Sequence, residues 1–114
     1  MKEIKAYVRI TTLGEVVQGL RAAGFPCMTI IDVSGLGNLV DPKQWNYSME
    51  FVQKMSKLAK IELACRDDDA AKVVDIIKKY GCTHQSGDGI LFVYNIERAV
   101  KIRTGEEGEQ VLQT

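Results

Sequence analysis

Apolar and polar residues alternate over the first strand-length stretch of the chain. In residues 2–10 every second side chain is apolar, which is typical of a β-strand with one buried face. Residues 13–23 then carry apolar side chains at helical spacing. Thr12, with Glu15 three residues later, predicts a capping box at the start of this helix, and Gly24 predicts its end. The chain therefore opens with a strand and an amphipathic helix.

A similar order of patterns follows in the rest of the chain. Residues 27–33 and 58–65 are runs rich in β-branched and apolar side chains, and each predicts a strand. The three aspartates at 67–69 predict the start of a second helix, where one carboxylate can cap and the others favour the positive helix end. Helically spaced apolar residues continue to Gly81, and residues 90–94 predict a fourth strand.

The predicted order is β-α-β, a long loop, and β-α-β. Two right-handed crossovers then give an α+β fold, the ferredoxin-like plait (split β-α-β), with a four-stranded antiparallel sheet and both helices on one face. Residues 38–56 show no period and are long for a connection, which is typical of a functional loop or a disordered segment. Residues 96–102 are expected to be a helical turn or a further strand, and residues 106–114 a polar tail. The uncovered sheet face is expected to be apolar and to form a cyclic homo-oligomer.

Composition limits the kinds of protein that this chain can be. Its 114 residues predict a single domain, 1–114, and equal numbers of basic and acidic residues (15 each) argue against nucleic acid as the main partner. No apolar run reaches membrane-spanning length, so we expect a cytoplasmic protein with no direct membrane insertion. Cys27, Cys65 and Cys82 form no metal-binding pattern, and His84 is the only histidine. We expect reduced structural thiols, a histidine at the surface or in a turn, and no metal site.

The candidate chemistry lies in two short motifs near the C-terminus. Gly87, Asp88 and Gly89 precede the fourth strand, and glycine amides can approach a phosphate closely because no Cβ blocks them. Lys101 and Arg103 stand two residues apart, which on a strand would place both cations on one face. The motifs suggest a site for a phosphorylated ligand. A tight turn and a solvated strand edge are the alternative interpretation.

Motifs spread over nearly the whole chain carry a family resemblance. They are Met1-Lys2-Glu3-Ile4-Lys5-Ala6, Gly24 with Met28-Thr29, Gly35-Leu36-Gly37, Lys60-Ile61-Glu62, Gly87-Asp88-Gly89, Leu91-Phe92-Val93 and Ile102-Arg103-Thr104-Gly105-Glu106. In these residues the chain resembles the PII nitrogen-regulatory signal-transduction proteins, as a divergent PII-like member. The resemblance implies a homotrimer with three clefts between subunits that bind ATP or ADP. It also implies a T-loop (37–56) that docks on a target membrane transporter or metabolic enzyme.

The resemblance further assigns roles to individual residues. The phosphate loop would be residues 82–89 and the C-terminal segment residues 103–114. The implied ligand-binding residues near the nucleotide base and sugar are Thr29, Gly35, Gly37 and Ala64. Asn38 is a further implied ligand-binding residue. Gly87, Asp88 and Gly89 would wrap the phosphates, which Lys101 and Arg103 would contact across the subunit boundary. Trp45, Tyr47 and Phe51 in the T-loop would bind the partner protein.

The chain departs from the family pattern at the residues that handle charge. Asn38 and Leu39 replace an arginine and a magnesium-holding glutamine, and Ile90 replaces a phosphate-binding lysine. Leu58 replaces the lysine that pairs with 2-oxoglutarate, and Lys57 would point the other way. We therefore expect an adenine nucleotide effector, with ADP or AMP bound at least as tightly as ATP, a doubtful role for Mg²⁺, and no 2-oxoglutarate response.

Two further expectations concern modification and the class of protein. Phe51 stands where some family members carry a tyrosine that is uridylylated, so this modification is expected to be lost. The protein is expected to be a regulator and not an enzyme, in nitrogen metabolism or another pathway. A ligand-free trimeric scaffold is the alternative. A small phosphatase or ATPase is the weaker one, because the sequence offers no histidine–carboxylate pair, P-loop or activated nucleophile.

Overall fold

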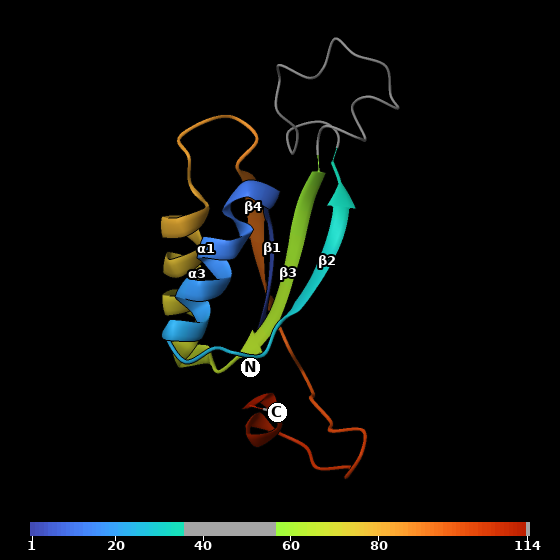
Figure 1. Ribbon diagram of the computed structural model, residues 1–114. Helices are drawn as coiled ribbons and strands as arrows, with labels where there is room; N and C mark the ends of the chain where they lie inside the picture. The colour runs from blue at the N-terminus through green and yellow to red at the C-terminus, as the bar shows by residue number, and fades with distance from the viewer. Residues whose placement is uncertain (36–56, 114) are drawn as a thin grey trace.

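A four-stranded antiparallel sheet, with two helices on one face, forms the body of the protein (Figure 1). The computed structural model describes residues 1–35 and 57–113. The elements are β1 (Lys2–Arg9), α1 (Ile10–Ala22), β2 (Thr29–Ser34), β3 (Lys57–Cys65), α3 (Asp67–Gly81), β4 (Gly89–Asn95) and the short 3₁₀ helix η3 (Glu109–Gln113). The strands lie in the order β2-β3-β1-β4, and each neighbouring pair is antiparallel. The predicted ferredoxin-like plait is confirmed.

The core lies between the sheet and the two helices. Ile4, Ala6 and Val8, at alternate positions of β1, are almost fully buried, as the alternation predicts. They belong to one apolar cluster with side chains of β3 and of both helices: Ile61, Leu63, Val16, Leu20, Val73 and Ile77. Burying each large aliphatic side chain contributes about 1.5–3 kcal/mol. This cluster therefore fixes which face of each strand is turned toward the helices.

The start of α1 differs from the prediction. The helix begins at Ile10, directly after β1, and Arg9 occupies the cap position without a side-chain hydrogen bond. Because no loop separates strand and helix, Thr12 falls inside the first turn, where its hydroxyl donates to the carbonyl oxygen of Arg9 at 3.2 Å. The predicted capping box is therefore wrong. The predicted end is confirmed, since Gly24 has a φ of 97° and its N–H donates to the carbonyl of Arg21.

The helix α3 starts where it was predicted to start, but the predicted side-chain cap is not formed. Asp67, Asp68 and Asp69 form its first turn, whereas Arg66 is the cap residue and no side-chain cap bond is made. Asp67 instead accepts a hydrogen bond from the N-terminal ammonium of Met1 at 2.8 Å. This bond, together with the ammonium charge, lowers the pKa of Asp67. The aspartates thus stabilise the helix start through charge and not through capping.

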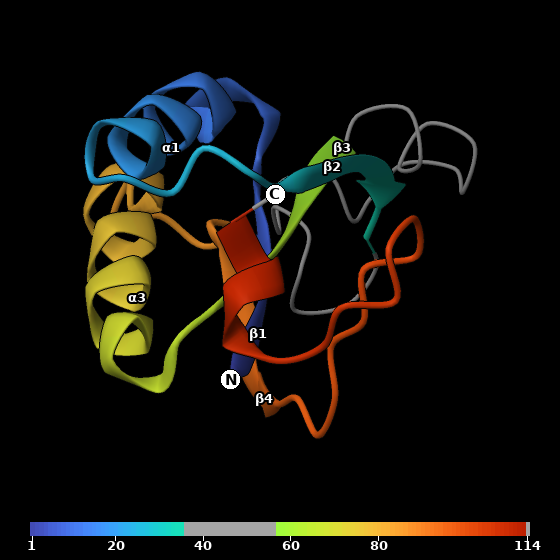
Figure 2. The same ribbon diagram turned by 90° about the horizontal axis from the view of Figure 1, so that it is seen from below.

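The segment after β4 also corrects the prediction. Residues 96–102 form neither a helical turn nor a strand, because Val100 makes only an isolated bridge with Glu107. The turn between them is closed by the Lys101 N–H, which donates to the Glu106 carbonyl at 2.8 Å. Residues 106–114 are not simply a polar tail, since Val111 in η3 is buried. Figures 1 and 2 show this segment extending beyond one end of the sheet.

The helix-free face of the sheet is mixed in character and not uniformly apolar. Tyr7 and Phe92 lie edge to face with ring centres 6.5 Å apart, and Tyr94 lies 6.3 Å from Phe92. Beside them, Lys60 and Glu62 form an ion pair at 3.1 Å. The expected apolar face is therefore only partly found, because β1 turns its aliphatic side chains toward the helices. Its role as an interface stays a prediction.

Candidate functional site

The glycine loop, residues 82–89, joins α3 to β4 at one end of the sheet. Gly87 and Gly89 have φ values of 97° and 109°, which side-chain-bearing residues rarely adopt. A Cβ at Gly89 would lie 1.7 Å from the carbonyl oxygen of Tyr7, on the neighbouring strand. The backbone of β1 thus packs directly against this glycine, and no other residue fits there.

Asp88 ties the glycine loop to β1 and to the start of the loop itself. Its carboxylate accepts hydrogen bonds from Arg9 Nε at 2.9 Å and from the Thr83 backbone N–H at 2.7 Å. The Thr83 hydroxyl donates to the same carboxylate, and Arg9 Nη2 also donates to the carbonyl of Ser86 at 2.6 Å. The loop is therefore held closed by one carboxylate and one guanidinium.

The ionised form of Asp88 is strongly favoured. Partial burial raises the pKa of this carboxyl, but the hydrogen bonds from Thr83 and Arg9 outweigh it and lower the pKa to about 2. Because the carboxylate is fully engaged, Asp88 positions the loop, and the backbone N–H groups are what the loop can offer an anion. No motif in the sequence pointed to Arg9 or Thr83. In the sequence Arg9 is one more polar residue in the alternating pattern of β1, and only the pairing of β1 with β4 brings it to the loop.

A second group of predicted residues lines a broad groove of about 780 Å³ at the opposite end of the sheet. Thr29, Ala64 and Lys101 line it together with Glu62 and other side chains. Lys101 and Arg103 lie in the turn between Val100 and Glu107, so the predicted shared strand face is wrong. Lys101 is half-buried and Arg103 is exposed.

The strand register separates the two groups. Val8 pairs with Gly89 at the glycine-loop end, where β2 also leads to Gly35. Thr29 pairs with Glu62 toward the other end, which holds the groove. One protomer therefore does not bring the glycine loop and the cations together. Gly37, Asn38 and Leu39, the T-loop (37–56) and its Trp45, Tyr47 and Phe51 lie outside the described residues.

Two departures from the family pattern can be located in the structure. Leu58, in the place of a ligand-binding lysine, is 4% exposed, whereas the neighbouring Lys57 is exposed on the alternate side of β3. Ile90, directly after the glycine loop, is 46% exposed and pairs with Tyr7. A hydrocarbon side chain thus stands at the position where the resemblance implies a phosphate-binding lysine.

The histidine lies beside one of the three cysteines. Cys27, Cys65 and Cys82 are free thiols, and Cys65 alone is buried. His84 lies exposed in the glycine loop with a φ of 62°, in accord with the predicted turn position, and its Nδ1 is 3.6 Å from the Cys82 sulfur. Among the described helices, none combines the length and apolar character needed to cross a membrane.

Comparison with known proteins places this fold and these motifs in one family. Residues 1–106 match the family model "Nitrogen regulatory protein P-II". The chain is 33% identical over 108 residues to the Nitrogen regulatory protein P-II of Bradyrhizobium diazoefficiens, which covers 95% of this chain and 96% of the relative. It is 35% identical over 112 residues to Nitrogen regulatory protein P-II 2 of Methanothermobacter thermautotrophicus, covering 98% and 97%. The chain belongs to the P-II family of signal-transduction regulators.

Proposed function

We propose that this protein is a non-enzymatic, cytoplasmic regulator that binds an adenine nucleotide between the subunits of a homotrimer. In this proposal the nucleotide state is passed to a target transporter or metabolic enzyme through the T-loop (37–56). The observation that carries the proposal is the separation of the glycine loop from the groove that holds Thr29, Ala64 and Lys101. Two half-sites at opposite ends of one protomer suit a ligand held between two protomers.

The contact between subunits is proposed to use the helix-free face of the sheet. Its exposed aromatic side chains on β4 and the ring of Tyr7 offer apolar area, and the charged row of β3 offers polar pairing. In such a trimer Lys101 and Arg103 of one subunit would approach the amides of Gly87 and Gly89 of the next. Amides and cations are what a polyphosphate needs.

The proposed effector is ADP or AMP at least as much as ATP. Each hydrogen bond to a charged group contributes about 1.5–3 kcal/mol, so the hydrocarbon side chain of Ile90 costs about tenfold or more in triphosphate affinity. With Leu39 and buried Leu58 in place of polar ligands, we propose a dispensable Mg²⁺ and no response to 2-oxoglutarate. Regulation by uridylylation is proposed to be absent, because Phe51 has no hydroxyl.

Calorimetric titration of the purified protein with ATP, ADP and AMP tests the proposal. We expect Arg103→Ala to abolish binding, because the substitution removes the exposed cation of the turn. Arg21→Ala, at the exposed end of α1, is the matched control and should leave binding unchanged. A trimer that binds none of the nucleotides would instead be a ligand-free scaffold. ATP binding that 2-oxoglutarate tightens would contradict the assigned departures.

A further inference from the structure

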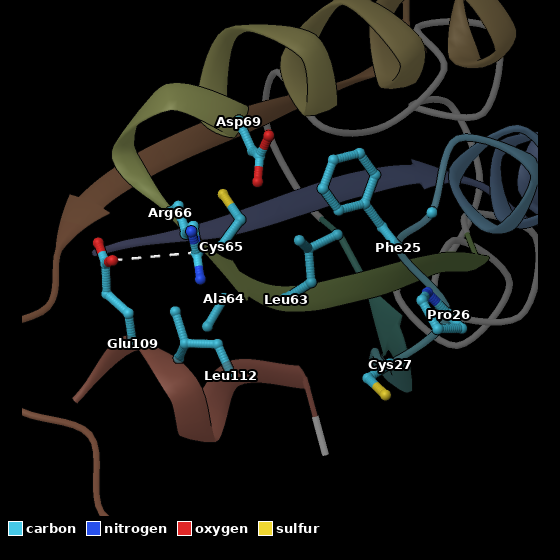
Figure 3. A pocket seen from close by; sticks show the side chains of 11 residues that line it. Phe25, Pro26, Cys27, Leu63, Ala64, Cys65, Arg66, Asp69, Glu109 and Leu112 are labelled. Carbon is cyan, nitrogen blue, oxygen red and sulfur yellow. Dashed lines mark ion pairs between the residues drawn. The ribbon is translucent and has the colours of Figure 1, made fainter. Parts of the chain in front are cut away.

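A smaller cavity, distinct from the glycine loop, lies at the end of the sheet under the start of α3. Its volume is about 320 Å³, and it is lined by residues of the connection from α1 to β2, the end of β3, the first turn of α3, and η3. One part of its wall is apolar, formed by Phe25, Leu63 and Leu112. Figure 3 shows Arg66 and Glu109 toward one side of this cavity, with Pro26 and Cys27 toward the other.

The charged part of the wall is unbalanced. Arg66 Nε lies 4.0 Å from the Glu109 carboxylate, the long limit of an ion pair, so these two charges offset each other weakly. Asp69 differs from Asp67, which pairs with the N-terminus. In the described part of the chain no hydrogen bond or ion pair reaches the carboxylate of Asp69. The wall holds two carboxylates and one guanidinium, and the carboxylate of Asp69 is free to pair.

Asp69 lines the cavity, and its neighbours there are mostly uncharged. In Figure 3 its carboxylate lies between the sulfur of Cys65 and the ring of Phe25. Burial and the charge of Asp69 raise the pKa of the Cys65 thiol, which therefore stays neutral and does not add a further negative charge. Lys72 Nζ lies 5.8 Å from the centre of the Phe25 ring, yet within the described structure it forms no ion pair with Asp69.

We propose that this cavity binds a small organic cation, a primary amine carried on a short apolar or aromatic body. The ammonium pairs with Asp69, and the body packs against Phe25, with Leu63 and Leu112 closing the apolar wall. The volume is at the lower end of small-molecule sites, which fits a compact ligand. A phosphorylated ligand is disfavoured by the two carboxylates. The cavity adjoins the broad groove and shares Leu63, Ala64 and Leu112 with it, but Asp69 and Phe25 line the cavity alone. The amine site therefore differs in chemistry from the proposed nucleotide site and does not rest on it.

Titration of the full chain with 2-phenylethylamine, without nucleotide, tests this proposal. We expect saturable binding with a dissociation constant on the order of millimolar, as for other ligands of this size. Asp69→Asn keeps the shape of the side chain and should weaken binding about tenfold, because a charge-assisted hydrogen bond is lost. Asp68→Asn is the matched control, because Asp68 directly precedes Asp69 and is exposed on the helix surface. This substitution should change the affinity for the amine less than twofold.

Two further measurements locate the amine in the cavity. 3-Phenylpropionate, an anion of similar size, should not saturate the protein. The amine should slow alkylation of exposed Cys27, which lines both the cavity and the adjoining groove, but not of Cys82, which is exposed in the glycine loop. The Asp69→Asn variant, which changes the cavity alone, should remove this protection. The proposal is overturned if the amine does not saturate, if the anion binds equally well, or if Asp68→Asn and Asp69→Asn have equal effects. Protection of both thiols or of neither would also overturn it.

Discussion

Replacing Asp88 by asparagine should destabilise the protein by about 2 kcal/mol at neutral pH. The substitution keeps the size of the side chain and removes the charge that Arg9 and Thr83 bind. The magnitude follows from the pKa of Asp88, which is lowered from 3.8 to about 2, since one pKa unit corresponds to about 1.36 kcal/mol. Because the side chains of Arg9 and Asp88 are only 21% and 22% exposed, solvent screens their interaction incompletely.

The pH dependence gives this prediction its sign. A carboxyl whose pKa is lowered in the folded state contributes its full stability above the unfolded pKa of 3.8. That contribution is lost as the pH falls through the folded pKa of about 2. The difference in unfolding free energy between the native chain and Asp88→Asn should therefore be largest above pH 5 and shrink toward pH 2.

Urea unfolding at fixed protein concentration, repeated from pH 7 down to pH 2, measures this difference. Asp68→Asn is the control, because Asp68 is an exposed aspartate in the first turn of α3, away from the glycine loop. The unfolding free energy of Asp68→Asn should follow that of the native chain at every pH. An Asp88→Asn difference near zero at pH 7, or one that stays constant with pH, would refute the role of the carboxylate in closing the glycine loop.

Further substitutions test the rest of the structure. Gly89→Ala should lose more than about 2 kcal/mol in thermal unfolding, whereas Gly14→Ala, which meets no atom within 4 Å, should gain up to about 1 kcal/mol. Light scattering should give three times the chain mass of 12.7 kDa, and Phe92→Asp on the helix-free face should give monomers. Ile90→Lys should raise ATP affinity about tenfold in calorimetry. Trp45→Ala should weaken target binding in a pull-down.

The sequence by itself determined the elements and the family. Alternation placed the buried face of β1, and helical spacing placed the buried stripes of α1 and α3, because burial of apolar side chains follows the period of each element. The aspartates at 67–69 marked the start of α3, and Gly24 marked the end of α1. The family match over residues 1–106 agrees with the motifs that carried the resemblance.

Local patterns failed where a side chain's partner lies far along the chain. Thr12 looked like a helix cap, but its place was decided by a strand that runs straight into α1. Lys101 and Arg103 looked like neighbours on a strand, but the Val100–Glu107 bridge makes their segment a turn. In both cases the local pattern was present, and the connection to neighbouring backbone decided the conformation.

Only the tertiary structure decided how the candidate sites are built. Arg9 reaches Asp88, 79 residues later in the chain, because β1 and β4 pair side by side and end together at the glycine loop. The antiparallel register of β2 and β3 puts Thr29 at the other end of the sheet, away from Gly87, in a groove that Lys101 also lines. The sequence shows which chemical groups are present, whereas strand order and register decide which of them meet. A contact between two distant segments leaves no periodic pattern in the sequence of either segment.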